Sequence, residues 1–107
     1  MGFFAKLFGI NQSSVIDLGT AISEGAFLVD VRSKSEFDSG TSKGAVNIPV
    51  EIIAQKLDQL KGKSNIVVFC RSGNRSAAAK RILESKGLKN VINGGTWQQV
   101  AQTMQQQ

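Results

Sequence analysis

The sequence Asn65-Ile-Val-Val-Phe-Cys70 runs directly into Arg71-Ser-Gly-Asn-Arg-Ser76. The first six residues form a short, apolar, β-branched run, which is typical of a strand buried on both faces of a sheet. The polar residues that follow, with Gly73 among them, predict a tight loop. An amphipathic segment over 75–86 then predicts a helix with one apolar face. This succession of strand, loop and helix is a building unit of α/β folds.

Elements of the same kinds alternate along the rest of the chain. In chain order we expect a helix capped by Ser13 or Ser14 and running to Glu24, a strand over 26–31, a mostly loop segment over 32–47 with a turn of helix near 35–38, an extended Ile48-Pro49, a helix over 51–61, the strand 65–70, the helix 75–86, a strand over 90–93, a turn at Gly94-Gly95 and a helix over 97–104. The alternation predicts an α/β fold with a small parallel β-sheet flanked by helices on both faces. Ligands bind beyond the carboxyl ends of the strands in such sheets, and Cys70 lies at such an end.

The chain has the length and composition of one globular domain. Its 107 residues are 41% hydrophobic and 20% charged, which is not the composition of a disordered chain. We assign residues 13–104 to the domain, residues 1–12 to an apolar extension that packs on it, and residues 105–107 to a frayed tail. No apolar run is long enough to span a bilayer.

The apolar side chains near the start of the chain share one face if residues 2–9 are helical. These side chains are Phe3, Phe4, Leu7 and Phe8. We expect the face to pack on the domain and close one end of its core, with contact to a membrane surface or docking on a partner as the alternatives. The segment is too short for a secretory signal, and no cleavage site follows it. We therefore expect a cytoplasmic, reducing location, which suits a free thiol.

Histidine is absent, and Cys70 is the single cysteine. This composition excludes an internal disulfide, a Cys-x-x-Cys redox pair, a cysteine zinc cluster and Cys-His catalysis. We expect neither a metal nor a cofactor. The formal net charge is +5, and six basic residues against the single acid Glu84 lie between Cys70 and Lys89. That part of the chain should attract anions, but no nucleic-acid recognition motif accompanies the charge.

Residues 70–76 place a thiol where a strand meets a helix N-terminus. Lowering a thiol pKa from about 8.5 to about 6.5 requires roughly 2.7 kcal/mol. A helix end supplies only about 0.3–1 kcal/mol. We therefore infer that loop amides also point at the sulfur, along a backbone path that Gly73 permits, and that the charges of Arg71 and Arg75 add to their effect. A lone cysteine ending an apolar strand is also common as plain core, so these residues alone leave both roles open.

The sequence resembles the rhodanese family in four blocks that follow the family's order. The blocks are Leu28-Val-Asp-Val-Arg32, Glu36-Phe37-x-x-Gly40 with Gly44-Ala-Val-Asn-Ile-Pro49, Val68-Phe-Cys-Arg-Ser-Gly-Asn-Arg-Ser76, and Val91-Ile-Asn-Gly-Gly95. The resemblance implies a sulfurtransferase in which Cys70 is the nucleophile that carries sulfur as a persulfide. It also implies that the loop after Cys70 cradles the sulfur and holds an anionic donor such as thiosulfate. The implied substrate-binding residues are Arg71, Ser72, Gly73, Asn74, Arg75 and Ser76.

Other matching positions and some departures carry less information on chemistry. Asp30, Arg32 and Glu36 match family positions that are mostly structural, and an Asp–Arg ion pair between loops is the expected role. Thr41-Ser42 stands where the family usually has His-Ile, which leaves the local packing open. Trp97 lies about two positions earlier than the family's tryptophan, and a glutamine-rich end replaces its usual closing segment.

Two alternatives to a freestanding sulfurtransferase follow from the resemblance. Related phosphatases and arsenate reductases of this fold place five residues between the cysteine and the arginine, whereas four separate Cys70 from Arg75. The tighter loop favours sulfur over a tetrahedral oxyanion. A sulfur carrier or interaction module, which passes persulfide to a partner protein rather than to a small thiol or cyanide, is the second alternative.

Overall fold

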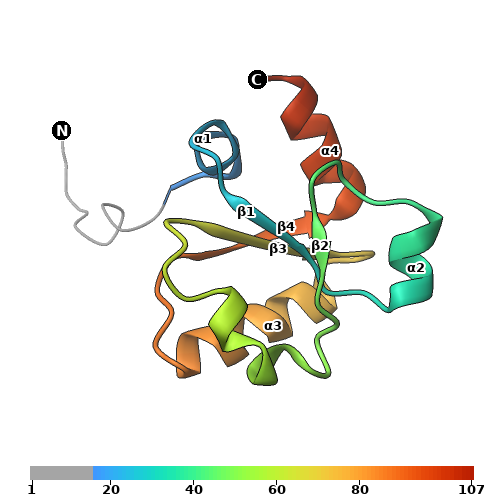
Figure 1. Cartoon of the computed structure of the whole chain (residues 1–107). Coiled ribbons are helices and arrows are strands. Elements are labelled where there is room, and N and C mark those ends of the chain that lie inside the picture. Colours follow the sequence, from blue (N-terminus) through green and yellow to red (C-terminus); the bar gives the residue numbers. More distant parts are fainter. Residues whose placement is uncertain (1–15) are drawn as a thin grey trace, which may run out of the picture.

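A computed structural model describes residues 16–107 as one four-stranded parallel sheet with helices on both sides (Figure 1). The strands are β1 (Phe27–Asp30), β2 (Val46–Asn47), β3 (Ile66–Cys70) and β4 (Val91–Thr96). Their order across the sheet is β2-β1-β3-β4, so β3 pairs with β1 on one side and with β4 on the other. The expected α/β class with a small parallel sheet is confirmed.

Two sets of elements cover the two faces of the sheet. One face carries α1 (Leu18–Ser23) and α4 (Trp97–Gln105), and the other carries α3 (Asn74–Ser85) with the 3-10 turns η2 (Ile53–Gln55) and η3 (Leu57–Gln59) (Figure 1). The short helix α2 (Lys34–Ser39) follows β1 and lies beyond its carboxyl end. Each face has its own hydrophobic cluster, and β3 contributes side chains to both.

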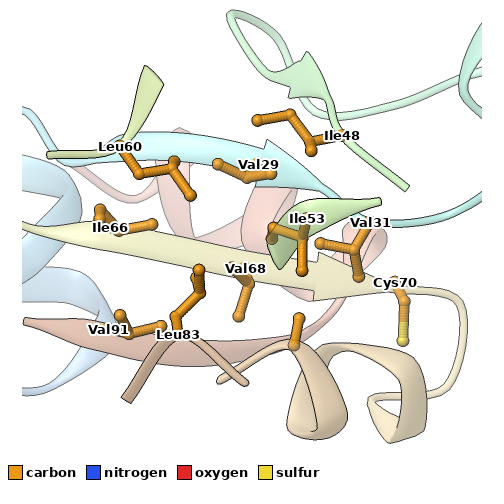
Figure 2. Packing of buried hydrophobic residues seen from close by; sticks show 11 residues of the cluster. Val29, Val31, Ile48, Ile53, Leu60, Ile66, Val68, Cys70, Leu83 and Val91 are labelled. Carbon is orange, nitrogen blue, oxygen red and sulfur yellow. The ribbon is translucent and has the colours of Figure 1, made fainter. Parts of the chain in front are cut away.

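The alternation along β3 decides which way the thiol points. All five of its residues are buried. Ile66, Val68 and Cys70 belong to the cluster on the α3 face, whereas Val67 and Phe69 belong to the cluster beneath α1 and α4. Figure 2 shows Cys70 at the carboxyl end of β3 with its sulfur on the same side of the sheet as Leu83 of α3. The period of two therefore places the sulfur next to the start of α3.

Two of the expected helices differ from those observed. The first begins at Leu18 rather than after Ser13 or Ser14, because the Asp17 side chain accepts the Thr20 N–H and caps it there. The helix expected over 51–61 is wrong, since nearly all of its backbone bonds run from residue i to i−3 and form the separate turns η2 and η3. Both turns serve packing: Ile53 and Leu60 are fully buried, while Ile52 is 37% exposed.

The strands at the two edges of the sheet also differ from expectation. Residues 46–47 form β2 within a segment expected to be loop. The turn expected at Gly94-Gly95 is wrong, because β4 continues to Thr96 and pairs Gly95 with Phe69. Gly94 is the extra residue of a bulge between the Val68–Asn93 and Phe69–Gly95 pairs. Its missing side chain lets α4 pack closely on the sheet.

The remaining expected elements lie within a residue or two of those observed. The turn of helix near 35–38 is α2, whose capping box joins Ser33 and Glu36. The helix expected over 75–86 is α3, one residue earlier, and α4 ends one residue later than expected. The apolar extension over 1–12 and the cap at Ser13 or Ser14 lie outside the described residues. Among residues 16–107, no helix has the length and apolar character needed to cross a bilayer.

The close packing at the bulge predicts that a side chain at Gly94 destabilises the fold. A Cβ at this position would lie 2.8 Å from both Val67 Cγ1 and Val100 Cγ2, so Gly94→Ala should lower the unfolding free energy. Overpacking of this kind costs about 1–3 kcal/mol. Gly19→Ala is the matched control. A Cβ at Gly19 would have its nearest neighbour at 3.6 Å, an ordinary contact, and alanine favours a helix over glycine at this position in α1. Urea unfolding of both variants checks this. A Gly94→Ala variant as stable as the wild type would contradict the close packing at Gly94.

Candidate active site

The Cys70 sulfur lies in a pocket of hydrogen-bond donors at the carboxyl end of β3. The Gly73 N–H donates to Sγ over 3.0 Å, and the Ser76 N–H donates over 3.4 Å. The Ser76 hydroxyl is 3.5 Å from the same sulfur. Cys70 itself is fully buried. Donors that converge on one atom in this way stabilise negative charge on it.

The conformation of Gly73 is what turns these donors inward. Its φ of +94° lies in the left-handed region, and it stands immediately before the first residue of α3. A Cβ there would lie 3.6 Å from the Gly95 backbone Cα, so the loop also approaches β4 closely. The first N–H groups of α3 have no partner within the helix and are free to face the sulfur.

These contacts set the pKa of the Cys70 thiol below its ordinary value. Burial is the largest single influence and raises the pKa, because a charged sulfur is poorly solvated there. Hydrogen bonds from the Ser76 hydroxyl and from the backbone of Ser76, Ser72 and Gly73 lower it by more in total. The inference that loop amides point at the sulfur therefore agrees with the structure.

Arg75 does not face the sulfur as a free charge. Its guanidinium forms a two-pronged ion pair with Glu36 of α2, with Nη1–Oε1 at 2.7 Å and Nη2–Oε2 at 3.0 Å. The hydrogen bond from Arg75 is the main reason that the pKa of Glu36 falls to about 2. Glu36 likewise raises the pKa of Arg75, with a smaller contribution from Cys70. Arg75 thus ties the start of α3 to α2.

Of the other expected site residues, Ser76 alone has a side-chain hydrogen bond to the sulfur. Arg71, Ser72 and Asn74 are exposed, and the Ser72 hydroxyl accepts the Asn74 N–H at 3.4 Å. Ser76 is buried and is the one loop side chain beside Sγ. Among the described residues, no three His, Cys, Asp or Glu side chains lie close enough together to hold a metal ion.

Asn93 belongs to the site, although the sequence did not single it out. Its amide lies against Ser76, Gly73 and Gly95, where β4 passes the loop. A signal was present in the sequence: Asn93 is a polar residue near the carboxyl end of a strand next to β3. Side chains at that edge of a parallel sheet gather around its ligand site.

A buried ion pair connects β1 to the segment after α2. Asp30 is fully buried and Arg32 is 4% exposed, and their closest contact, Nη2–Oδ2, measures 2.7 Å. Arg32 also donates to the Gly40 carbonyl, and Thr41 donates its hydroxyl proton to Asp30 Oδ2 at 2.7 Å. The expected Asp–Arg pair is present, but it joins residues two apart at the end of β1, and the contacts with Gly40 and Thr41 make the link to the other segment. Thr41 completes the hydrogen bonds that the buried carboxylate needs.

Ser42 and Trp97, two further departures from the family pattern, contact each other. The Ser42 hydroxyl is buried and donates to the Trp97 carbonyl at 2.7 Å. The Arg32 guanidinium lies 5.5 Å from the centre of the Trp97 ring, within the range of cation–π attraction. The serine and the early tryptophan together fasten α4 to the segment after α2.

The family model for the rhodanese-like domain matches residues 14–99, which is most of the chain and contains Cys70, its loop and Asn93. This chain belongs to the rhodanese-like domain family. The fold and the match agree, because the described sheet and its covering helices resemble those of solved rhodanese-like proteins.

The proteins similar to this chain include some named as sulfurtransferases and one named as a sulfur carrier. A Schizosaccharomyces pombe protein named "Putative thiosulfate sulfurtransferase, mitochondrial" is 35% identical over 88% of this chain and 72% of its own. The structure of the human single-domain sulfurtransferase TSTD1 is 31% identical, with a TM-score of 0.65 over 77% of this chain and 87% of its own. A Bacillus subtilis protein named "Putative sulfur carrier protein YrkF" is 33% identical over 62% of this rhodanese-like chain, which matches 36% of the relative.

The ion pair between Glu36 and Arg75 predicts an acid-sensitive contribution to the stability of this rhodanese-like domain. The Glu36 pKa is about 2 in the folded protein against an ordinary 4.5. Its contribution is therefore complete above about pH 4.5 and is lost as the pH falls toward 2. Glu36→Gln should be less stable than the wild type at pH 7, and the difference should shrink between pH 5 and pH 3.

Urea unfolding at pH 7, 5, 4 and 3 tests this dependence. Asp38→Asn is the matched control, because the Lys34–Asp38 pair is mostly exposed and should matter little at any pH. A Glu36→Gln deficit that stays constant over this range would show that the ionised pair is not its cause.

Proposed function

We propose that this chain is a sulfurtransferase that takes sulfane sulfur from an anionic, thiosulfate-like donor onto Cys70 and passes it to a thiol or to cyanide. The observation that carries the proposal is the convergence of the Gly73 and Ser76 N–H groups on Cys70 Sγ. A plain core cysteine has no need of such donors, whereas a nucleophilic thiolate does. The lowered pKa of the thiol points the same way.

The proposed reaction needs neither a metal nor a histidine. The Cys70 thiolate attacks the outer sulfur of thiosulfate and forms a new S–S bond. The original S–S bond breaks, and its electron pair leaves with sulfite. The Cys70 persulfide keeps one negative charge, and the loop N–H groups stabilise it as they stabilise the thiolate. A thiolate or cyanide acceptor then attacks the outer sulfur of the persulfide and releases the Cys70 thiolate.

An anionic donor fits the electrostatics of the loop. The N-terminus of α3 presents partial positive charge beside the sulfur. Arg71 is exposed next to Cys70, while the Arg75 charge is largely balanced by Glu36. Of the two arginines, Arg71 is therefore the better candidate for attracting the donor, and Arg75 acts mainly through the position of α3.

A sulfur carrier is the second candidate, favoured by the similarity to the Bacillus subtilis protein of that name. A carrier would form the same persulfide but would release the sulfur only to a partner protein. Catalytic turnover with a small thiol or cyanide separates the two. A cytoplasmic location remains part of the proposal, although the fission yeast relative is named as mitochondrial.

The first experiment is the intact mass of the protein after incubation with thiosulfate. We expect a gain of one sulfur atom that a reductant removes and that is absent in Cys70→Ser. Cys70→Ala should likewise abolish sulfur transfer while keeping the fold. Transfer that persists in either variant would overturn the assignment of Cys70.

The same preparation distinguishes the phosphatase alternative. A wild type that gains no sulfur but hydrolyses para-nitrophenyl phosphate would replace the proposed function with phosphate chemistry. The loop of four residues between Cys70 and Arg75 leads us to expect no such hydrolysis.

The role of Arg71 makes a separate kinetic prediction. Arg71→Gln should raise the KM for thiosulfate about 1.4- to 5-fold with a smaller change in kcat, since an exposed charge contributes about 0.2–1 kcal/mol. Arg81→Gln removes the same charge from an exposed position farther along α3 and is the matched control. Equal effects of the two variants would mean that net charge, rather than the position of Arg71, attracts the donor.

A further inference from the structure

Asn93 joins three parts of the site through its amide group. Its Oδ1 accepts the Gly95 N–H at 2.9 Å and lies 2.7 Å from the Ser76 hydroxyl oxygen. Its Nδ2 donates to the Gly73 carbonyl at 3.3 Å. Asn93 therefore contacts the residue that turns the loop and the hydroxyl beside the sulfur, although it does not touch the sulfur itself.

The partners of Asn93 fix which way its amide points. A backbone N–H only donates, so the atom facing Gly95 is the carbonyl oxygen. A backbone carbonyl only accepts, so the atom facing Gly73 is the amide nitrogen. The Ser76 hydroxyl, which lies against the carbonyl oxygen, must then be the donor in that contact.

Ser76 has one hydroxyl proton and three acceptors within reach. They are Asn93 Oδ1 at 2.7 Å, the Gly73 carbonyl at 3.1 Å and Cys70 Sγ at 3.5 Å. The shortest contact is to Asn93. While the proton is there, the serine oxygen offers the sulfur only its lone pairs, which can accept an S–H proton but cannot stabilise a thiolate.

We propose that Asn93 is a positioning residue that holds the Ser76 hydroxyl proton away from Cys70 while the sulfur is neutral and releases it to the sulfur when the sulfur is charged. Rotation about the Ser76 C–O bond accomplishes the transfer, and no covalent bond changes. After the rotation Asn93 Oδ1 keeps the Gly95 N–H, so the amide oxygen still has a hydrogen-bond partner. The network thus has two satisfied arrangements.

This inference rests on the proposed function, because only a sulfur that alternates between neutral and charged forms uses both arrangements. Several charged groups lie around the site: Arg71, Arg75, Glu36, Glu51, Asp30 and Arg32. Within residues 16–107 none of them is hydrogen-bonded to Asn93 or Ser76, and the nearest pairs are committed to each other. The competition for the Ser76 proton is therefore separable from their charges.

The test is a double-mutant cycle read by the pH dependence of Cys70 alkylation with iodoacetamide. Asn93→Leu removes the nearer of the two acceptors that compete with the sulfur for the Ser76 proton. The apparent pKa of alkylation should therefore fall by about half a unit, roughly a threefold rise in thiolate at lower pH. Ser76→Ala should raise it. In the Ser76→Ala background, adding Asn93→Leu should produce no further shift, because no hydroxyl proton remains to be released.

Two further variants control for overfilling of the site and for the general effect of losing an amide side chain. Asn93→Ala makes the same test if the leucine overfills the site. Asn90→Leu is the matched control, since that amide bonds the Lys63 and Ser64 carbonyls at the other end of β4 and should leave the pKa unchanged. Circular dichroism confirms the fold of each variant.

The alkylation results can overturn the proposal in two ways. A pKa that rises or stays the same in Asn93→Leu and Asn93→Ala overturns the proposal, and so does an equal shift in both backgrounds, which would assign the effect to the Gly73 contact. Alkylation reports on the thiol whether or not sulfur is transferred. A wild type that gains no sulfur from thiosulfate would therefore overturn the proposed function while leaving the pattern of pKa shifts to be judged on its own.

Discussion

The pairing of β3 with strands on both sides is the constraint on which the rest of this structure depends. With β1 and β4 bonded to its edges and hydrophobic clusters on both faces, every residue of β3 is buried and its register is fixed. A slip by one residue would exchange the two faces and send the Cys70 side chain toward α4. The position and direction of the thiol are thus consequences of sheet packing rather than of the loop.

Once the thiol is fixed, the loop only has to bring donors to it. Gly73 turns the chain into α3 with a positive φ, and the N–H groups that the helix leaves unpaired face the sulfur. Burial alone would favour the neutral thiol, so the donors must outweigh the loss of solvation. A site built from backbone groups needs few specialised side chains, which agrees with a chain that lacks histidine.

Two ion pairs hold the surrounding segments in place. Asp30 and Arg32 fasten the end of β1 to the residues after α2, and Glu36 and Arg75 fasten α2 to the start of α3. The buried pair is acceptable because its polar atoms find partners in Gly40 and Thr41. Among the described residues, no fully buried side-chain nitrogen or oxygen lacks a hydrogen bond. The segments around the site, which are α2, the residues after it and the start of α3, are therefore held to one another and to the sheet.

The sequence by itself determined the fold class, the buried central strand, the helix that follows it and the place of Cys70 at their junction. These features depend on local patterns: apolar runs, helical spacing and a glycine in a short polar loop. The tertiary structure alone decided that residues 51–61 form two 3-10 turns, that β4 continues through Gly94 and Gly95, and that Arg75 faces Glu36. It also brought Asn93 to Ser76. The reason is that these outcomes depend on partners between 17 and 39 residues apart, or on packing against the sheet, and the period of a short segment carries no information about either.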